Sequence, residues 1–307
     1  GSIALFLFTA KLIEWFGKRL LLLFLLSIAT LATLGLAFAQ TGFYVLISFI
    51  AYSSVLLTIY YCLDIFLEEL SMESNTGEVR GFYLTLINLG IAAGPIILLI
   101  FGNDDTFKRI YILATLLLVP PIFLTLFFLK SRMPKWHGIT HRHIFLPFGI
   151  WWRTKTLRRV TIARFVLESF FAFMVIYTPI YLHGNLGFEW SELGIIFTIM
   201  LLPFVIFQWP AGELADRYYG EKEIMSIGFL ITSLSLIIMP FLGKVFAAWL
   251  IVLFISRVGA SFVEVMTESY FFKHVGPRDT GLISIFRLTR PVSIVLGAGA
   301  GILALSV

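Results

Sequence analysis

Ionisable side chains recur inside long apolar runs of this sequence, where a charge is costly unless it is paired or wetted. The run around residue 257 carries four polar residues that share one helical face: Arg257, Ser261, Glu264 and Glu268. At 100° per residue they fall within about 60° of one another, so this face must contact protein or water rather than lipid. Its carboxylates could take up and release a proton, because burial favours the neutral form of a carboxyl group.

Two other runs carry charged residues at the spacing of one helical turn. Asp64 is followed four residues later by Glu68 in one of them. In the other, Arg164 precedes Glu168 by four residues, which is the spacing of a helical ion pair. The residues deepest in their runs are the candidates for binding a substrate or a coupling proton: Asp64, Glu168, Arg257 and Glu264. In this group Arg257 would be a counter-charge or a ligand for an anionic group.

Other charges lie close to the ends of their runs, where long side chains can reach water. We expect three of them to form gating or inter-helix ion pairs: Glu68, Arg164 and Glu268. Arg287 and Arg290 open a later apolar run, where the positive end of the helix dipole disfavours a cation. A carboxylate partner is therefore expected, and Arg287 could pair with Glu264 or Glu268.

The amino-acid composition indicates that the chain is a membrane protein. Of the 307 residues, 59% are hydrophobic and 13% are charged, which is more apolar surface than a water-soluble core of this size can hide. Runs of about 20 apolar residues match helices that cross a hydrocarbon layer of roughly 30 Å. The sequence therefore predicts an all-α polytopic membrane protein.

Nine full spans are expected, and a further apolar run from Ile3 to about Ala10 is too short to cross a bilayer. The full spans are 20–39, 43–67, 81–101, 109–129, 161–182, 191–211, 223–242, 245–272 and 281–306. Alternating them across the bilayer places most Lys and Arg residues on one side, including eight in segment 130–159. The positive-inside rule makes that side cytoplasmic, so we expect a protein of the cell (inner) membrane with this loop in the cytoplasm.

An internal repeat divides the spans into two parallel sets. Asp64 and Glu68 have acidic counterparts 200 residues later, and Gly81 has a glycine counterpart at the same offset. We expect three parts in chain order: an N-terminal helical bundle at 1–130, a basic cytoplasmic linker at 131–159 and a C-terminal helical bundle at 160–307. If each bundle has six helices, the first and the twelfth are missing, so about ten of twelve spans are present.

A charged turn, GELADRYYGEK, begins at Gly212 between two apolar runs. A degenerate copy of this turn lies about 202 residues earlier and has Glu14 at the position that corresponds to Asp216. The turn resembles the signature loop of the major facilitator superfamily of transporters, read as Gly-x-Leu-Ala-Asp-Arg followed by a glycine and a basic residue. The resemblance implies a gating loop, in which Asp216 braces a helix from the other half in one conformational state and Arg217 holds the turn together. The alternative is a generic solvated hairpin. Gly220 stands one residue later than in the family, which predicts a wider turn.

A second resemblance involves small residues of the span 81–101. Their spacing is similar to the fifth-helix motif of the antiporter branch of that superfamily, which implies a drug/proton antiporter-like protein: Gly81, Gly90, Gly94 and Pro95. The alternative is helix packing, in which Gly90 and Gly94 let a neighbouring helix approach closely and Pro95 kinks the span. By helix count, the resemblance places the three charged faces on the fourth, seventh and tenth helices, which line the central cavity in that family.

Other functions find little support in the residues. Three histidines have spacings that a metal could use, but their surroundings are basic and hold no cysteine or carboxylate: His137, His141 and His143. We therefore expect no metal site, no cofactor other than a coupling proton, and no enzyme activity. The basic residues follow membrane topology rather than one soluble face, so no nucleic-acid partner is expected.

The patterns together favour a secondary active transporter, a monomer in the lipid bilayer that moves a small-molecule substrate by alternating access with ion or proton coupling. On the pattern of the resembled family, two bundles would rock around a site near the bilayer midplane. The alternative is a transporter-like scaffold or sensor that no longer transports. The degenerate copy of the turn at Glu14 would be compatible with that function.

Overall fold

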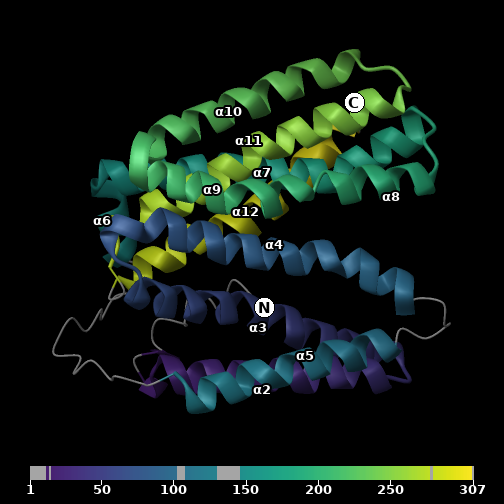
Figure 1. The fold of residues 1–307 in the computed structure, drawn as a ribbon. Helices are drawn as coiled ribbons and strands as arrows, with labels where there is room; N and C mark the ends of the chain where they lie inside the picture. The colour runs from purple at the N-terminus through teal and green to yellow at the C-terminus, as the bar shows by residue number, and fades with distance from the viewer. Residues whose placement is uncertain (1–11, 14, 102–107, 130–145, 277–278, 306–307) are drawn as a thin grey trace. The chain divides into compact units, whose positions relative to one another are not determined.

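Every regular element in the described part of the chain is a helix (Figure 1). The structure is a computed structural model that describes residues 12–13, 15–101, 108–129, 146–276 and 279–305. The helices before the basic segment are α2 (Lys18–Phe38), α3 (Gly42–Leu70), α4 (Thr76–Phe101) and α5 (Lys108–Phe127). The later helices are α6 (Leu146–Arg153), α7 (Lys155–Ile180), α8 (Trp190–Ile199), α9 (Leu202–Leu214), α10 (Glu221–Ile238), α11 (Phe246–Phe272) and α12 (Thr280–Leu305).

The helices occupy the predicted spans, because hydropathy and span length are local properties of the chain. Seven helical segments of the described residues are long and apolar enough to cross a membrane: Lys18–Phe38, Gly42–Glu69, Lys108–Phe127, Lys155–Asn185, Trp190–Tyr219, Glu221–Phe241 and Phe246–Phe272. The predicted span 191–211 is shared by α8 and α9. The predicted all-α polytopic architecture is confirmed, whereas the short run before Ala10 and the side chain of Glu14 lie outside the described residues.

A π-helical turn, Ala215–Tyr219 (η3), follows α9 and contains both Asp216 and Arg217. The N–H of Gly220 donates to the Ala215 carbonyl oxygen at 3.0 Å, which closes the wider i to i+5 ring of a π-helix. Gly220 itself has a φ of 81°, a left-handed conformation that only glycine adopts freely. The predicted wide turn is therefore confirmed, and α10 begins at the next residue.

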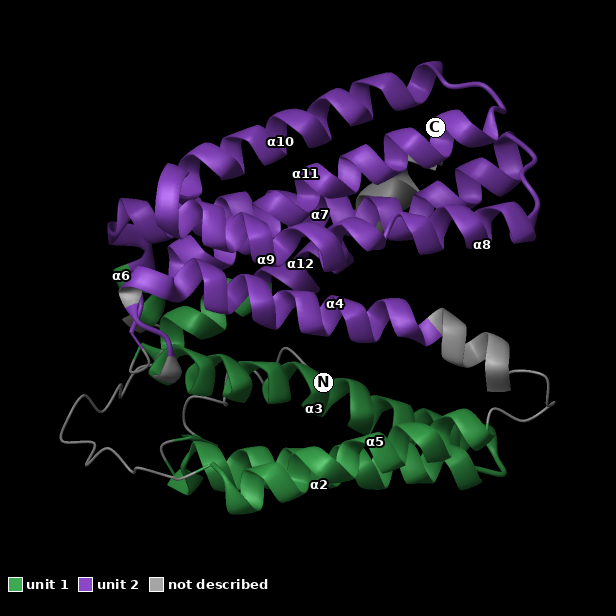
Figure 2. Ribbon diagram, in the orientation of Figure 1, with its two compact units in different colours: residues 1–70, 96–150, 277–288 green, residues 71–95, 151–276, 289–307 purple. Residues whose placement is uncertain are grey.

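The chain divides into two compact units (Figure 2). The first unit comprises residues 1–70, 96–150 and 277–288, and so holds α2, α3, α5 and the start of α12. The second comprises residues 71–95, 151–276 and 289–307, and so holds α7 to α11, most of α4 and the rest of α12. The predicted bundles follow chain order instead, and the linker boundaries at 131 and 159 stay a prediction.

In the first unit, α2 packs against α3 and α5 through residues spaced three or four apart: Leu21, Leu22, Leu25, Leu26 and Ala29. Polar contacts extend this interface at both ends. Thr115 Oγ1 lies 3.0 Å from Thr33 Oγ1, and the ammonium of Lys18 pairs with the carboxylate of Glu69. The core of this unit is therefore a three-helix contact with an ion pair at one end.

In the second unit, two sets of contacts bring α11 against its neighbours. A Cβ built on Gly259 would lie 2.5 Å from the Gly228 carbonyl oxygen, so α10 and α11 approach as closely as their backbones allow. An apolar cluster joins α7, α9 and α11: Leu167, Phe204, Ala260 and Val263. This packing holds one face of α7 against α11, and it is the face that carries the charged residues described next.

Candidate functional site

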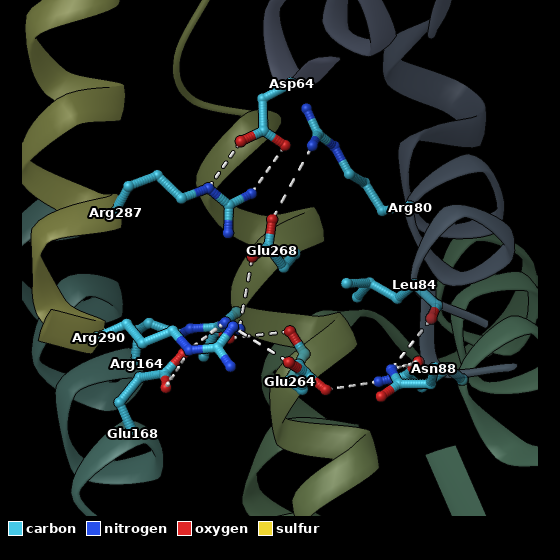
Figure 3. A network of polar contacts seen from close by, with 12 residues as sticks. Asp64, Arg80, Leu84, Asn88, Arg164, Glu168, Glu264, Glu268, Arg287 and Arg290 are labelled. Carbon is cyan, nitrogen blue, oxygen red and sulfur yellow. Dashed lines mark hydrogen bonds and ion pairs between the residues drawn. The ribbon is translucent and has the colours of Figure 1, made fainter. Parts of the chain in front are cut away.

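A cluster of charged side chains in the second unit has Arg164 of α7 at its centre (Figure 3). Arg164 Nη2 lies 2.7 Å from Glu168 Oε1 and 3.5 Å from Glu264 Oε1. Its Nη1 lies 3.4 Å from Glu268 Oε1. Only 5% of the Arg164 side chain is exposed, so these contacts are little screened by water, and an unpaired charge here would be costly.

Two more arginines reach the same glutamates from other helices. Arg80 of α4 places Nη1 3.9 Å from Glu268 Oε2, and its guanidinium lies 3.4 Å from the centre of the Phe272 ring. Arg290 of α12 places Nε 3.9 Å from Glu168 Oε2. We call the set the arginine–glutamate cluster: Arg80, Arg164, Glu168, Glu264, Glu268 and Arg290. Its three guanidinium groups balance its three carboxylates when all are ionised.

A pair of amide side chains extends the cluster toward α4. Gln208 Nε2 of α9 donates to Glu264 Oε2 at 2.7 Å, and Gln208 Oε1 accepts from Asn88 Nδ2 of α4 at 2.9 Å. Gln208 is fully buried, so both bonds fix the orientation of its amide. These amides are not among the predicted site residues, since an Asn or Gln within an apolar run is the only signal that they give in the sequence.

The structure brings five of the predicted site residues together in this cluster: Arg164, Glu168, Glu264, Glu268 and Arg290. Arg80 is an addition to them. It precedes the predicted span 81–101, so nothing in the hydropathy pattern marks it as buried, yet its side chain is fully enclosed. Hydropathy thus predicts burial more reliably within an apolar run than at the end of one.

Asp64 and Arg287 form an ion pair within the first unit (Figure 3). Arg287 Nε donates to Asp64 Oδ2 at 2.7 Å and its Nη2 donates to Asp64 Oδ1 at 2.8 Å, so the pair is bidentate. Asp64 is fully buried on α3, and Glu68 lies one turn further along the same helix. Arg287 thus has the carboxylate partner that its place in α12 requires, although the sequence argument named Glu264 or Glu268 for that role.

Arg257 lies apart from these ion pairs. Its side chain is buried in the middle of α11, and its guanidinium lies 4.9 Å from the centre of the Phe170 ring and 5.8 Å from that of Phe171. Within the described residues, no ion pair joins it to an aspartate or glutamate, and its Nη1 atom has no hydrogen-bond partner. The structure therefore offers no support for Arg257 as a counter-charge to a described carboxylate.

The charged turn after α9 contacts the first turn of α4. Asp216 Oδ2 accepts a hydrogen bond from the backbone N–H of Glu78 at 2.8 Å, at the end of a helix where the dipole favours an anion. Its Oδ1 lies 2.8 Å from Lys273 Nζ. Arg217 is more than half exposed and pairs with Glu213 of the same turn at 3.0 Å. The gating roles that the resemblance implies for these two residues stay predictions.

Glycines allow α4 and α9 to meet at this point. A Cβ on Gly212 would collide with the Gly77 carbonyl oxygen, and a Cβ on Gly81 would lie 2.5 Å from the Gln208 carbonyl oxygen. By contrast, nothing lies within 4 Å of a Cβ built on Gly90 or Gly94. In the described part of the chain, close approach therefore depends on the start of α4. The side chain of Pro95 is not among those described.

Lys273, which follows α11, ties the turn together by pairing with both Asp216 and Glu221. Burial lowers the pKa of Lys273, but its hydrogen bonds to these two carboxylates outweigh burial and raise the pKa above its ordinary value of 10.5. A raised pKa means that the folded state binds the proton more tightly than the unfolded state. The stabilisation is thus complete below pH 10.5 and is lost as the pH rises through the higher, folded-state pKa.

We expect the Lys273→Met variant to lose about 1–3 kcal/mol of stability at neutral pH, because two charge-assisted hydrogen bonds disappear. Thermal unfolding in detergent measures the loss. The difference from the wild type should stay constant from pH 7 to pH 9 and shrink above pH 10.5. Lys222→Met is the matched control, since Lys222 is an exposed lysine of the same turn. An equal loss in both variants would contradict the role given to Lys273.

No group of three or more His, Cys, Asp and Glu side chains within the described ranges could hold a metal ion. His137, His141 and His143 lie outside these ranges. The arrangement that the described residues do offer is one of buried ion pairs, hydrogen-bonded amides and an arginine without a carboxylate partner. Such groups can bind, release and exchange protons or charged solutes.

Comparisons with known proteins add a family and a fold. The family model described as Major Facilitator Superfamily matches residues 1–298. A search of curated protein sequences found no match.

Three solved structures of transporters are similar to this chain. The human organic anion transporter MFSD10 aligns with a TM-score of 0.79 at 16% identity, over 96% of this chain and 75% of its own. A bacterial homologue of the iron transporter ferroportin, in an outward-facing state, has a TM-score of 0.75 at 13% identity, with 98% and 81% covered. The E. coli fucose:proton symporter has a TM-score of 0.77 at 14% identity, with 97% and 80% covered. At these identities the likeness establishes the fold alone.

Proposed function

Because the chain belongs to the Major Facilitator Superfamily, whose model matches residues 1–298, we propose that it moves a small solute by alternating access and couples the movement to protons. It is an integral membrane protein with several spans. The observation that carries the proposal is the arginine–glutamate cluster. Buried ionisable groups on facing helices are costly to a bundle with only a structural role, and they are what a proton-coupled transporter requires.

Glu264 is the carboxylate of the cluster that we propose as the proton acceptor. Among the described residues its one cationic partner within ion-pair distance is Arg164, at 3.5 Å. Glu168 lies closer to the same guanidinium, at 2.7 Å, and is less exposed, with 4% of its side chain accessible against 14% for Glu264. A proton on Glu264 would remove one of the three negative charges around Arg164, and the arginine would shift toward the other two.

Contacts of the charged turn support alternation between two states. Asp216 is bound through the first turn of α4 and through Lys273, and such contacts can form in one state and break in another. We propose that Asp64 acts with Arg287 as a second gating pair rather than as a proton site. Both oxygens of its carboxylate already accept hydrogen bonds from the guanidinium, so the carboxylate is engaged in a bidentate ion pair.

The similar structures support a transporter without naming a solute. They are an organic anion transporter, a homologue of an iron transporter and a fucose:proton symporter, so one fold serves chemically different cargoes. Proton coupling in the fucose symporter is compatible with the role proposed for Glu264. The distribution of Lys and Arg supports a place in the cell membrane with segment 130–159 in the cytoplasm. We further propose that the protein is a monomer.

The test is solute uptake by proteoliposomes under an imposed pH gradient. We expect Glu264→Gln to abolish pH-driven uptake, because glutamine keeps the hydrogen bond to Gln208 but cannot exchange a proton. The variant should stay folded in detergent, since it removes one carboxylate from a cluster with three. Glu223→Gln makes the same chemical change at an exposed position and should retain wild-type uptake.

Two results would count against the proposal in different ways. Normal pH-driven uptake by Glu264→Gln would remove this residue from the coupling mechanism. The absence of any flux or solute-dependent thermal shift in the wild type, over a broad screen of solutes, would favour the scaffold or sensor alternative.

A further inference from the structure

Arg257 is a buried charge of the second unit that the proposed proton path does not use. Its relative exposure is 3%, and its Nη1 atom has no hydrogen-bond partner. No described aspartate or glutamate forms an ion pair with it. A guanidinium always carries its charge, so it cannot escape this cost by losing a proton. Any counter-charge for Arg257 would have to come from outside the described residues.

The aromatic rings beside Arg257 satisfy only part of this requirement. Its guanidinium lies 4.9 Å from the centre of the Phe170 ring and 5.8 Å from that of Phe171. A ring face attracts a cation, but it cannot accept the directed hydrogen bonds of the five N–H groups at the edge of a guanidinium. The rings hold the side chain in place and leave its hydrogen-bonding edge for another group.

Neighbouring polar side chains are already engaged. The hydroxyl of Ser256 donates to the Leu253 carbonyl oxygen at 2.7 Å, and that of Ser261 donates to the Val258 carbonyl oxygen at 2.8 Å. Two planar oxygens of a carboxylate or sulfonate would match the guanidinium fork better than either hydroxyl could. An anionic group brought by a ligand would supply the acceptor that Nη1 of Arg257 lacks among the described residues.

The surroundings also indicate what the rest of that ligand is like. Phe170 and Phe171 pack onto the apolar cluster of α7, α9 and α11, to which Phe204 and Ala260 belong. Phe171 and Phe204 form an edge-to-face pair with ring centres 5.8 Å apart. A sugar-like body would need hydrogen-bond partners that these residues do not provide. An aromatic or aliphatic body would be compatible with them.

Arg257 also lies near the middle of a helix long enough to cross a bilayer, and transporters commonly hold their substrates near the bilayer midplane. It is two residues from the centre of the 27-residue helix α11, or about 3 Å along the axis. We propose that Arg257 binds the anionic group of the transported solute, and that this solute is an organic carboxylate or sulfonate with an apolar or aromatic body. The inference rests on the proposed transport function and names the class of solute for it.

Matched probes test the charge requirement on the purified full chain. Benzoate and benzenesulfonate carry the anionic group, whereas benzamide has nearly the same shape and is neutral. We expect both anions to raise the melting temperature of the wild type in detergent and benzamide to leave it unchanged. Arg257→Lys should weaken benzoate binding and Arg257→Met should reduce it by about 10- to 100-fold, as expected for lost hydrogen bonds to a charged group. Arg159→Gln removes an exposed arginine of α7 and should bind benzoate as the wild type does.

The ligand-free stability of Arg257→Met separates a binding role from a structural one. Removal of a buried charge that has no partner should leave the melting temperature unchanged or raise it. A fall would reveal a resident counter-charge in the chain and would overturn the proposal. Equal binding of benzamide and benzoate, wild-type benzoate affinity in Arg257→Met, or no anion binding to the wild type would overturn it as well.

The same measurements distinguish this inference from the proposed transport function. Benzoate binding that depends on Arg257 without any benzoate flux would support the anion site and count against transport. Flux of a neutral solute that is unaffected by Arg257→Met would support transport and reject the anion site.

Discussion

Replacing Arg164 with glutamine is expected to destabilise the protein by about 3–5 kcal/mol, because it leaves buried carboxylates without their main counter-charge. The guanidinium of Arg164 contacts three glutamates, at 2.7, 3.4 and 3.5 Å. Without it, Arg80 remains at 3.9 Å from Glu268 and Arg290 at 3.9 Å from Glu168. The variant should show a large fall in melting temperature in detergent and no measurable uptake.

A second substitution should reverse part of this loss. Glu168 makes the shortest contact with Arg164, so Arg164→Gln combined with Glu168→Gln removes one positive and one negative charge together. The double variant should be more stable than Arg164→Gln alone, and a double-mutant cycle measures the coupling energy between the two residues. Uptake need not return with stability, since the cluster would still lack its central cation.

Arg159→Gln is the control for the arginine series, because Arg159 is an exposed arginine on the same helix. Its free energy of unfolding should lie within about 0.5 kcal/mol of the wild-type value, as is usual for surface substitutions. If Arg164→Gln were as stable as this control, or if the second substitution gave no recovery, the cluster would not be an interdependent network.

Much of the fold follows from local features of the sequence. Each predicted span is a run of apolar residues whose length matches a bilayer, so its helix can be recognised without knowing its neighbours. The wide turn at Gly220 could likewise be predicted from spacing alone, since one extra residue between Arg217 and the glycine requires a larger ring. The family resemblance at Gly212 and Asp216 pointed to the superfamily that the family model identifies.

The pairings within the site could not be predicted as well, because they depend on which helices meet and how each is rotated. Asp64 and Glu264 occupy equivalent places in the sequence repeat. The structure nevertheless gives Asp64 a bidentate contact with Arg287, and it gives Glu264 a looser contact with Arg164 and a hydrogen bond to Gln208. Sequence spacing thus identified the charged residues but not the chemistry that each environment supports.

Glycine showed the same limit. Spacing favoured Gly90 and Gly94 as the close-packing pair of α4, and in the described structure nothing lies near either of them. Gly77 and Gly81, one turn apart at the start of the helix, instead meet the backbone of α9. A pattern of small residues shows where a neighbouring helix could approach closely. The position of that neighbour decides where the close approach actually occurs.

We expect the Gly212→Ala variant to lose about 1–3 kcal/mol of stability and most of its transport. The added methyl group would collide with the Gly77 carbonyl oxygen, which belongs to the backbone and cannot move aside as a flexible side chain would. Relief requires α4 and α9 to separate, and the hydrogen bond from the Glu78 N–H to Asp216 would lengthen with them. Thermal unfolding and uptake by proteoliposomes measure the two losses.

Gly90→Ala is the matched control, because it adds the same methyl group to α4 where nothing lies within 4 Å. Alanine is the better helix former, so this variant should be unchanged or more stable by up to about 1 kcal/mol. If contact between α4 and α9 belongs to only one state of the transport cycle, Gly212→Ala should reduce uptake more than it reduces stability. Equal behaviour of the two alanine variants would mean that close approach at Gly212 has no part in folding or in transport.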